Sequence, residues 1–187
     1  MKIQTIIVGC LLLALIFGGC AGNSFDYLAY QQSELVIDAD FTIGSVNYSG
    51  TITLGPVVDQ VFANRDLSIS YTAPQNLSGL TVAREDGRDY LISDMLNIPA
   101  RNNELSNMLE ICRLFSIENP VFRESKQLEL SGVKCQYIRV CDNYGSYEIY
   151  LDNTTGLPKK IEAKLADTQI TLNVKKINAP LEQATTP

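Results

Sequence analysis

The chain has 187 residues, a formal net charge of −6 and no histidine. The acidic balance argues against nucleic acid or an anionic membrane surface as an electrostatic partner. Since the commonest general base and the commonest transition-metal ligand are both missing, we expect neither an enzyme nor a protein that holds a metal or another cofactor.

The first segment is an apolar run at positions 6–17, which follows Lys2 and ends at the tetrapeptide FGGC (17–20). The run is too short for a membrane-spanning helix, which needs about 20 residues, and its flanks are typical of a secretory signal. The tetrapeptide resembles the lipobox of bacterial lipoproteins, in which the cysteine is acylated and the chain is cut just before it. This resemblance implies a signal peptide over residues 1–19 and a lipid on Cys20. A plain secreted protein or an uncleaved anchor is the alternative.

Residues 20–24 form a short tether between the predicted lipid anchor and the first predicted element. Four extended residues reach at most about 14 Å, so the domain would sit against the bacterial cell membrane, on its extracytoplasmic side. A fixed carrier, acceptor or sensor fits this placement better than a shuttle that must move freely. Asn23 or Ser24 is positioned to cap a short helix that runs to about Gln32.

The segments that follow alternate between apolar and polar side chains. They are ELVIDADFTIG (34–44), VNYSGTITLG (46–55) and LSISYTAP (67–74). A period of two is typical of antiparallel strands that bury one face and expose the other. The next segment, LTVAREDGRDYLIS (80–93), is typical of a hairpin with Asp86 and Gly87 at its turn.

The period changes to that of a helix between residues 103 and 116. Leu105, Met108, Leu109, Cys112 and Phe115 recur there at helical spacing. The pattern therefore predicts a second short helix, with one apolar face that must pack against the sheet.

Strand patterns return in the last third of the chain. They cover QLEL (127–130), KCQYIRVC (134–141), SYEIYLD (146–152), PKKIEAKLA (158–166) and QITLNVKKI (169–177). In the turn DNTTGLP (152–158), we expect Gly156 to supply a positive φ and Pro158 to begin the next strand. Residues 178–187 are expected to form a polar tail.

Three cysteines, Cys112, Cys135 and Cys141, lie outside the leader, so at most one disulfide can form within the chain. Cys135 and Cys141 are six residues apart in one predicted strand, roughly 20 Å when extended, which is beyond the reach of a disulfide. They can pair only if the strand breaks between them. We favour three free thiols that pack as small apolar residues.

The predicted elements are nine to eleven strands and only two short helices. Ten strands at a spacing of about 4.8 Å form a sheet roughly 50 Å wide, whereas a 13-residue helix is only about 20 Å long. Since two such helices cannot cover a flat sheet, the sheet must curl around them. We therefore predict an α+β, mainly β domain over residues 25–177. It is a single highly curved antiparallel sheet, a half-open barrel of about 9–11 strands, with two short helices on its concave side.

Three stretches resemble the outer-membrane lipoprotein carrier (LolA-like) superfamily. They are YSGTITL (48–54), ISYTAPQNLSGLTV (69–82) and YEIYLDNTTGLPKKIEA (147–163). In that group a strand ends in Asp, the turn carries Thr-Gly-Leu-Pro, and the next strand returns with alternating charges; here these positions are Asp152 and Thr155 to Pro158. The resemblance implies a non-enzymatic half-barrel whose concave apolar face binds acyl chains or docks a protein partner.

The sequence is compatible with two functions. The first is a membrane-anchored lipoprotein that binds a lipid or acyl chain between the curled sheet and its helices. The second is an envelope protein-interaction module whose core is filled and holds no ligand. Under the first function, the inward-facing residues expected to line the ligand are Phe41, Ile43, Ile52, Leu54, Ile69 and Tyr71 from the strands, with Met108, Leu109 and Phe115 from the helix.

Overall fold

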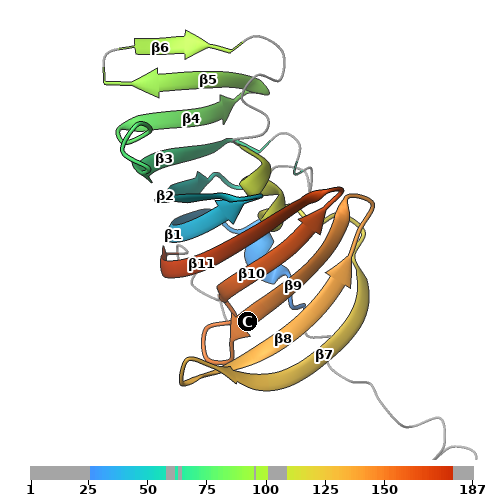
Figure 1. Cartoon of the computed structure of the whole chain (residues 1–187). Helices are drawn as coiled ribbons and strands as arrows, with labels where there is room; N and C mark the ends of the chain where they lie inside the picture. The colour runs from blue at the N-terminus through green and yellow to red at the C-terminus, as the bar shows by residue number, and fades with distance from the viewer. Residues whose placement is uncertain (1–25, 58–61, 63–64, 95, 101–108, 179–187) are drawn as a thin grey trace, which may run out of the picture.

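The computed structural model describes residues 26–57, 62, 65–94, 96–100 and 109–178 (Figure 1). Eleven strands form one sheet in this part of the chain. The strands are β1 (Leu35–Ile43), β2 (Val46–Leu54), β3 (Leu67–Ala73), β4 (Leu80–Glu85), β5 (Arg88–Ser93), β6 (Leu96–Pro99), β7 (Val121–Leu130), β8 (Val133–Cys141), β9 (Gly145–Asp152), β10 (Pro158–Leu165) and β11 (Thr168–Asn178). The predicted signal peptide, Cys20, the tether, Met108 and the polar tail lie outside the described residues.

The strand order is β6-β5-β4-β3-β2-β1-β11-β10-β9-β8-β7, and every neighbouring pair is antiparallel. Strands that are neighbours in the sheet are also consecutive in sequence, with the exception of β1 and β11. The β1–β11 pair joins strands β1–β6 to strands β7–β11 in one sheet. The sheet ends at β6 and β7, so it stays open, and it curls around the short helical segments (Figure 1). The predicted single, curved antiparallel sheet is therefore confirmed.

Both segments predicted to be short helices contain helical turns, and Leu109 in the second is α-helical. Ala29–Gln32 and Glu110–Phe115 are 3₁₀-helices, here η1 and η3, although residues 101–108 of the second predicted helix are not described. Four of the six residues of η3 are buried, so the sheet and η1 pack on more than one of its sides. Short connecting turns and the ends of α-helices commonly take 3₁₀ geometry. In the described part of the chain, no helix has the length and apolar character needed to cross a membrane.

The alternation in the sequence gives the sheet one apolar and one polar face. On the polar face, side chains of β2 donate hydrogen bonds to carboxylates of β1. Ser49 Oγ donates to Asp40 at 2.6 Å, and Thr51 Oγ1 donates to Asp38 at 2.7 Å. The β4–β5 turn has positive φ at Asp86 (47°) and Gly87 (72°), as expected for a two-residue hairpin. These local features set the register that directs every second side chain into the core.

The three cysteines outside the leader are all free. Cys112 and Cys135 are buried, as predicted, while Cys141 is only half-buried. Cys135 and Cys141 belong to the same unbroken strand, β8, which keeps their side chains apart.

Candidate functional site

The residues predicted to line a ligand are brought together, but in this structure they form a packed core. Phe41, Ile52, Leu54, Ile69 and Tyr71 are at most 2% exposed, and Leu109 and Phe115 are 4% and 0% exposed. Ile43 is half-buried at the edge of the same cluster, and Met108 lies outside the described residues. The ring of Phe115 meets that of Tyr30 edge-on, with centroids 6.3 Å apart, so η3 and η1 close over the strands together.

Arg65 stabilises the packing of η1 and η3 against the strands. The residue is 2% exposed, and its guanidinium donates hydrogen bonds to backbone carbonyls of Gln31 (3.0 Å) and Phe115 (3.4 Å), as well as to those of Ser33 and Gly55. These carbonyls lie at the C-terminal ends of η1 and η3 and just after β2, where the guanidinium supplies donors that the helical turns themselves do not. Burial lowers the pKa of Arg65 to about 10, which leaves the guanidinium charged at neutral pH.

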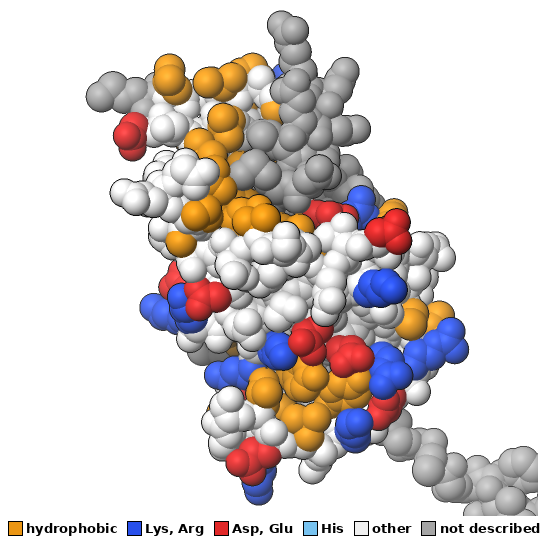
Figure 2. Space-filling model, viewed as in Figure 1, with side chains coloured by type: hydrophobic (Ala, Val, Ile, Leu, Met, Phe, Trp, Pro, Cys, Tyr) orange, Lys and Arg blue, Asp and Glu red, His pale blue; other side chains and the backbone are white. Residues whose placement is uncertain are grey.

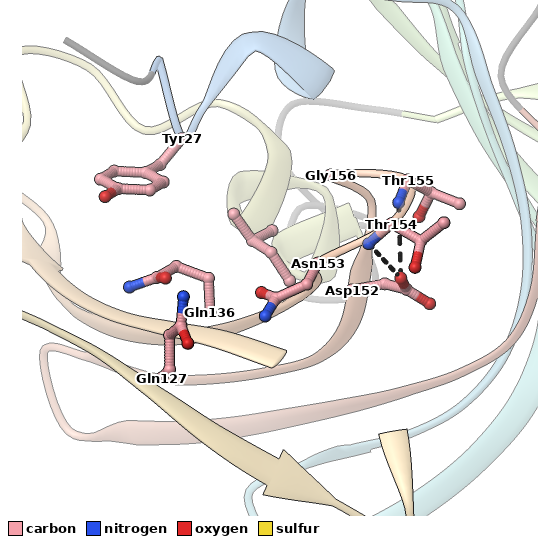
Figure 3. A pocket seen from close by; sticks show the side chains of 9 residues that line it. Tyr27, Gln127, Gln136, Asp152, Asn153, Thr154, Thr155 and Gly156 are labelled. Atoms are coloured by element: carbon pink, nitrogen blue, oxygen red, sulfur yellow. Dashed lines mark hydrogen bonds between the residues drawn. The ribbon is translucent and has the colours of Figure 1, made fainter. Parts of the chain in front are cut away.

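An open groove lies beside this core, at the β7–β9 end of the sheet (Figure 3). Its volume is about 610 Å³, within the usual range for ligand pockets. We call it the amide groove because three primary amides surround it. Its lining residues are Tyr27, Gln127, Gln136, Leu151, Asp152, Asn153, Thr154, Thr155 and Gly156. A smaller hollow of about 260 Å³ continues along η1 and shares Tyr27, Leu151, Thr155 and Gly156 with it.

Strand geometry explains how these side chains meet. In β8, Gln136 lies on the same face as Ile138 and opposite Leu151 of β9, so a polar residue occupies an inward position. Gln127 of β7 is the register partner of Gln136. Gln136 Nε2 donates to Ser125 Oγ at 2.7 Å, and Ser125 Oγ donates to the Tyr27 hydroxyl at 3.5 Å. Figure 3 shows the side chains of Gln127, Gln136 and Asn153 gathered on the side of the groove that faces the Tyr27 ring.

The turn after β9, which supplies Asn153, also lines the groove with its other residues. Asp152 Oδ1 accepts hydrogen bonds from the backbone N–H groups of Thr154 (2.7 Å) and Thr155 (3.4 Å). These contacts, led by the N–H of Thr154, hold the pKa of Asp152 below its ordinary value, and Lys159 Nζ lies 3.6 Å from Oδ2. Gly156 has a φ of 69°, and Pro158 begins β10, so the predicted structural roles of this turn are confirmed.

The other end of the concave face is apolar and exposed. In β6, Leu96 is 62% and Ile98 50% exposed, and Ile98 is the register partner of half-buried Leu91 in β5. Figure 2 shows hydrophobic side chains at the surface over this end of the sheet. The apolar face of the sheet thus continues beyond its packed middle.

The described residues contain no group of three or more His, Cys, Asp or Glu side chains placed to hold a metal ion. Burial raises the pKa of the Cys112 thiol to about 12, so this cysteine stays protonated and is a poor nucleophile.

The sequence patterns do not reveal three residues of the amide groove, Tyr27, Gln127 and Gln136. They do not reveal Arg65 either. The one available signal is Gln136, because it breaks the apolar register of β8 at a position that faces inward. Arg65 carries no pattern at all, since it lies in a short segment between two strands.

Comparison with known proteins identifies similar folds but assigns no function. No protein-family model matches the sequence, and no relative is found among curated proteins. An uncharacterised conserved protein from Thermus thermophilus is similar in structure, with a TM-score of 0.50 and 8% identity over 85% of this chain and 86% of the other.

Two further structures also resemble this chain. The LolA superfamily protein NE2245 from Nitrosomonas europaea has a TM-score of 0.43 and 9% identity, over 86% of this chain and 94% of that one. In the Pseudomonas aeruginosa MucA/MucB complex, the values are 0.44 and 17%, over 82% of this chain but only 54% of the other, so this chain spans about half of that protein. At 8% identity, the likeness to the Thermus thermophilus protein shows a shared fold and nothing more.

Proposed function

We propose that this protein is a non-enzymatic binding module of the bacterial cell envelope, anchored to the membrane through a lipid on Cys20. In this proposal the amide groove is the binding surface, and the protein acts there as a fixed acceptor or sensor. The observation that carries the proposal is the contrast along the concave face: the middle is packed, while the β7–β9 end is hollowed over about 610 Å³.

The remaining features of the structure are consistent with binding rather than chemistry. The groove holds one carboxylate, Asp152, and that group is already occupied by the turn and Lys159. The test is whether filling the groove with a large side chain at Gln127, which is exposed, removes a bound molecule from the purified protein.

The anchor itself gives a separate prediction. If the FGGC tetrapeptide (17–20) is the acylated site, the Cys20→Ser variant should incorporate no radiolabelled palmitate. The matched control is Cys10→Ser, because Cys10 also follows an apolar tripeptide but lies too early to leave an apolar middle region. Labelling that persists in Cys20→Ser, or disappears in Cys10→Ser, would contradict anchoring at Cys20.

A second candidate function is the carriage of a lipid or acyl chain on the apolar concave face, with the nine predicted lining residues. The exposed β6 side chains favour it, because Leu96 and Ile98 extend that face to solvent and would offer an entry to an apolar chain. In this case the segments η1 and η3 would have to move away from the core to admit the ligand.

Two neighbouring positions of β6 test this candidate. Ile98 faces Leu91 on the concave side, whereas Asn97 faces Ile92 on the other side of the sheet. If acyl chains enter here, a fluorescent fatty acid should bind the wild-type chain, and Ile98→Asp should weaken that binding by at least about tenfold, whereas Asn97→Asp should not. Both side chains are exposed, so neither change should unfold the protein. Equal binding by both variants, or none by the wild type, would reject lipid carriage on this face.

A further inference from the structure

The amide groove carries unused hydrogen-bonding capacity of one particular kind. Within the described part of the chain, the side chains of Gln127 and Asn153 make no hydrogen bond, and Gln136 uses only its Nε2 toward Ser125. A primary amide presents a carbonyl acceptor and an N–H₂ donor side by side. Three such groups around one hollow therefore suit a ligand that both donates and accepts hydrogen bonds at many points.

The groove is also close to electrically neutral. None of its nine lining residues is Lys or Arg, and its single carboxylate, Asp152, is bound by two backbone N–H groups and lies near Lys159. A phosphate or carboxylate ligand would find no cation among these lining residues, and burying an anion without a partner is costly. This argues against phospholipid headgroups and other anions as the species recognised here.

Apolar surface accompanies the amides on two sides. The Tyr27 ring is half-buried, and its position is fixed by the neighbouring ring of Phe122, whose centroid is 6.2 Å away. Buried Leu151 also lines the groove. An aromatic ring with convergent polar groups around it recognises a ligand that has flat apolar faces and a polar rim.

We propose that the amide groove binds a neutral glycan of a few sugar units. A sugar ring combines hydroxyl groups at its rim, each both donor and acceptor, with apolar C–H faces that can lie on Tyr27. An extended peptide fits less well, because peptides that join a sheet pair with the free backbone of an edge strand. The two glutamines here lie on the face of β7 and β8 and not along the free edge of β7. The inference rests on the proposed function, since it names the ligand class for the same binding surface.

The test uses an array of neutral oligosaccharides of two to six sugar units. The full-length chain is solubilised in a detergent without a sugar headgroup, so that the detergent does not compete. We expect at least one glycan to bind with a Kd below about 1 mM, and the double variant Gln127→Ala/Gln136→Ala to weaken it by about tenfold or more. Tyr27→Leu should weaken it as well, whereas Tyr27→Phe, which keeps the ring, should retain most of the affinity.

The matched control is Gln169→Ala, an exposed glutamine on β11 that lies outside the groove lining. It should leave glycan binding unchanged. The inference is overturned if no neutral glycan binds, or if binding does not respond to the amide variants. Binding of tetra-alanine that does respond to them would reject the glycan but keep the groove as the binding surface. A fluorescent fatty acid that binds independently of them, with no glycan bound, would reject both.

Discussion

Replacing Arg65 by methionine is expected to lower the free energy of unfolding by about 3–5 kcal/mol. The arginine is buried and donates to four backbone carbonyls, which belong to the ends of η1 and η3 and to the residue after β2. Methionine keeps the length and apolar stem of the side chain but leaves those carbonyls without a donor in a region that excludes water. Each hydrogen bond to a charged group contributes about 1.5–3 kcal/mol, and the four are not independent.

Urea denaturation of the variant measures this effect, with Arg88→Met as the matched control. Arg88 lies at the exposed β4–β5 turn, so its replacement should change stability by no more than about 0.5 kcal/mol. Arg65→Lys should recover only part of the loss, because an ammonium group cannot reach carbonyls on three segments at once. A loss below about 1 kcal/mol for Arg65→Met would mean that η1 and η3 are held in place by other contacts.

The second large effect is expected at Phe115, whose side chain is 0% exposed at the end of η3. Phe115→Ala should cost about 3–5 kcal/mol, since it removes a buried ring and leaves a cavity between η3, η1 and the strands. The matched control is Phe122→Ala, because Phe122 is 49% exposed and its ring contacts Tyr27 at the rim of the amide groove. We expect that substitution to cost much less.

The same pair of variants distinguishes a filled core from a lid. If η3 were a mobile cover over a ligand cavity, its removal from the core would cost little, and Phe115→Ala would lose less than about 1 kcal/mol in urea denaturation. That result would favour the acyl-chain function over binding at the amide groove. A loss near the expected value would instead support a permanently packed middle of the concave face.

The strands were the most predictable part of this fold. Period-two alternation locates β1, β2 and β3 to within about one residue, and the Asp86-Gly87 pair locates the β4–β5 hairpin. The two strands at the sheet edges behave differently. All four residues of β6 are exposed, and the first half of β7 is largely exposed, so neither strand has a buried face that would impose alternation.

The helical segments and the groove depend on contacts that no local pattern records. Helical spacing around Cys112 correctly marks a buried helical segment, but that spacing does not distinguish the 3₁₀-helix found at Glu110–Phe115 from an α-helix. The amide groove forms only when Gln127, Gln136 and the 152–156 turn meet through the pairing of β7, β8 and β9. The position of Tyr27 and the role of Arg65 likewise follow from tertiary packing.

The measurement that tests the central claim most directly is native mass spectrometry of the protein isolated from its own cell envelope. Three forms are compared: wild type, Gln127→Trp, which fills the amide groove, and Gln169→Trp, which places the same ring on β11 outside it. The account predicts a bound species on the wild type and on Gln169→Trp that is lost from Gln127→Trp. No bound species on the wild type, or one that Gln127→Trp retains in full, would contradict binding at the groove.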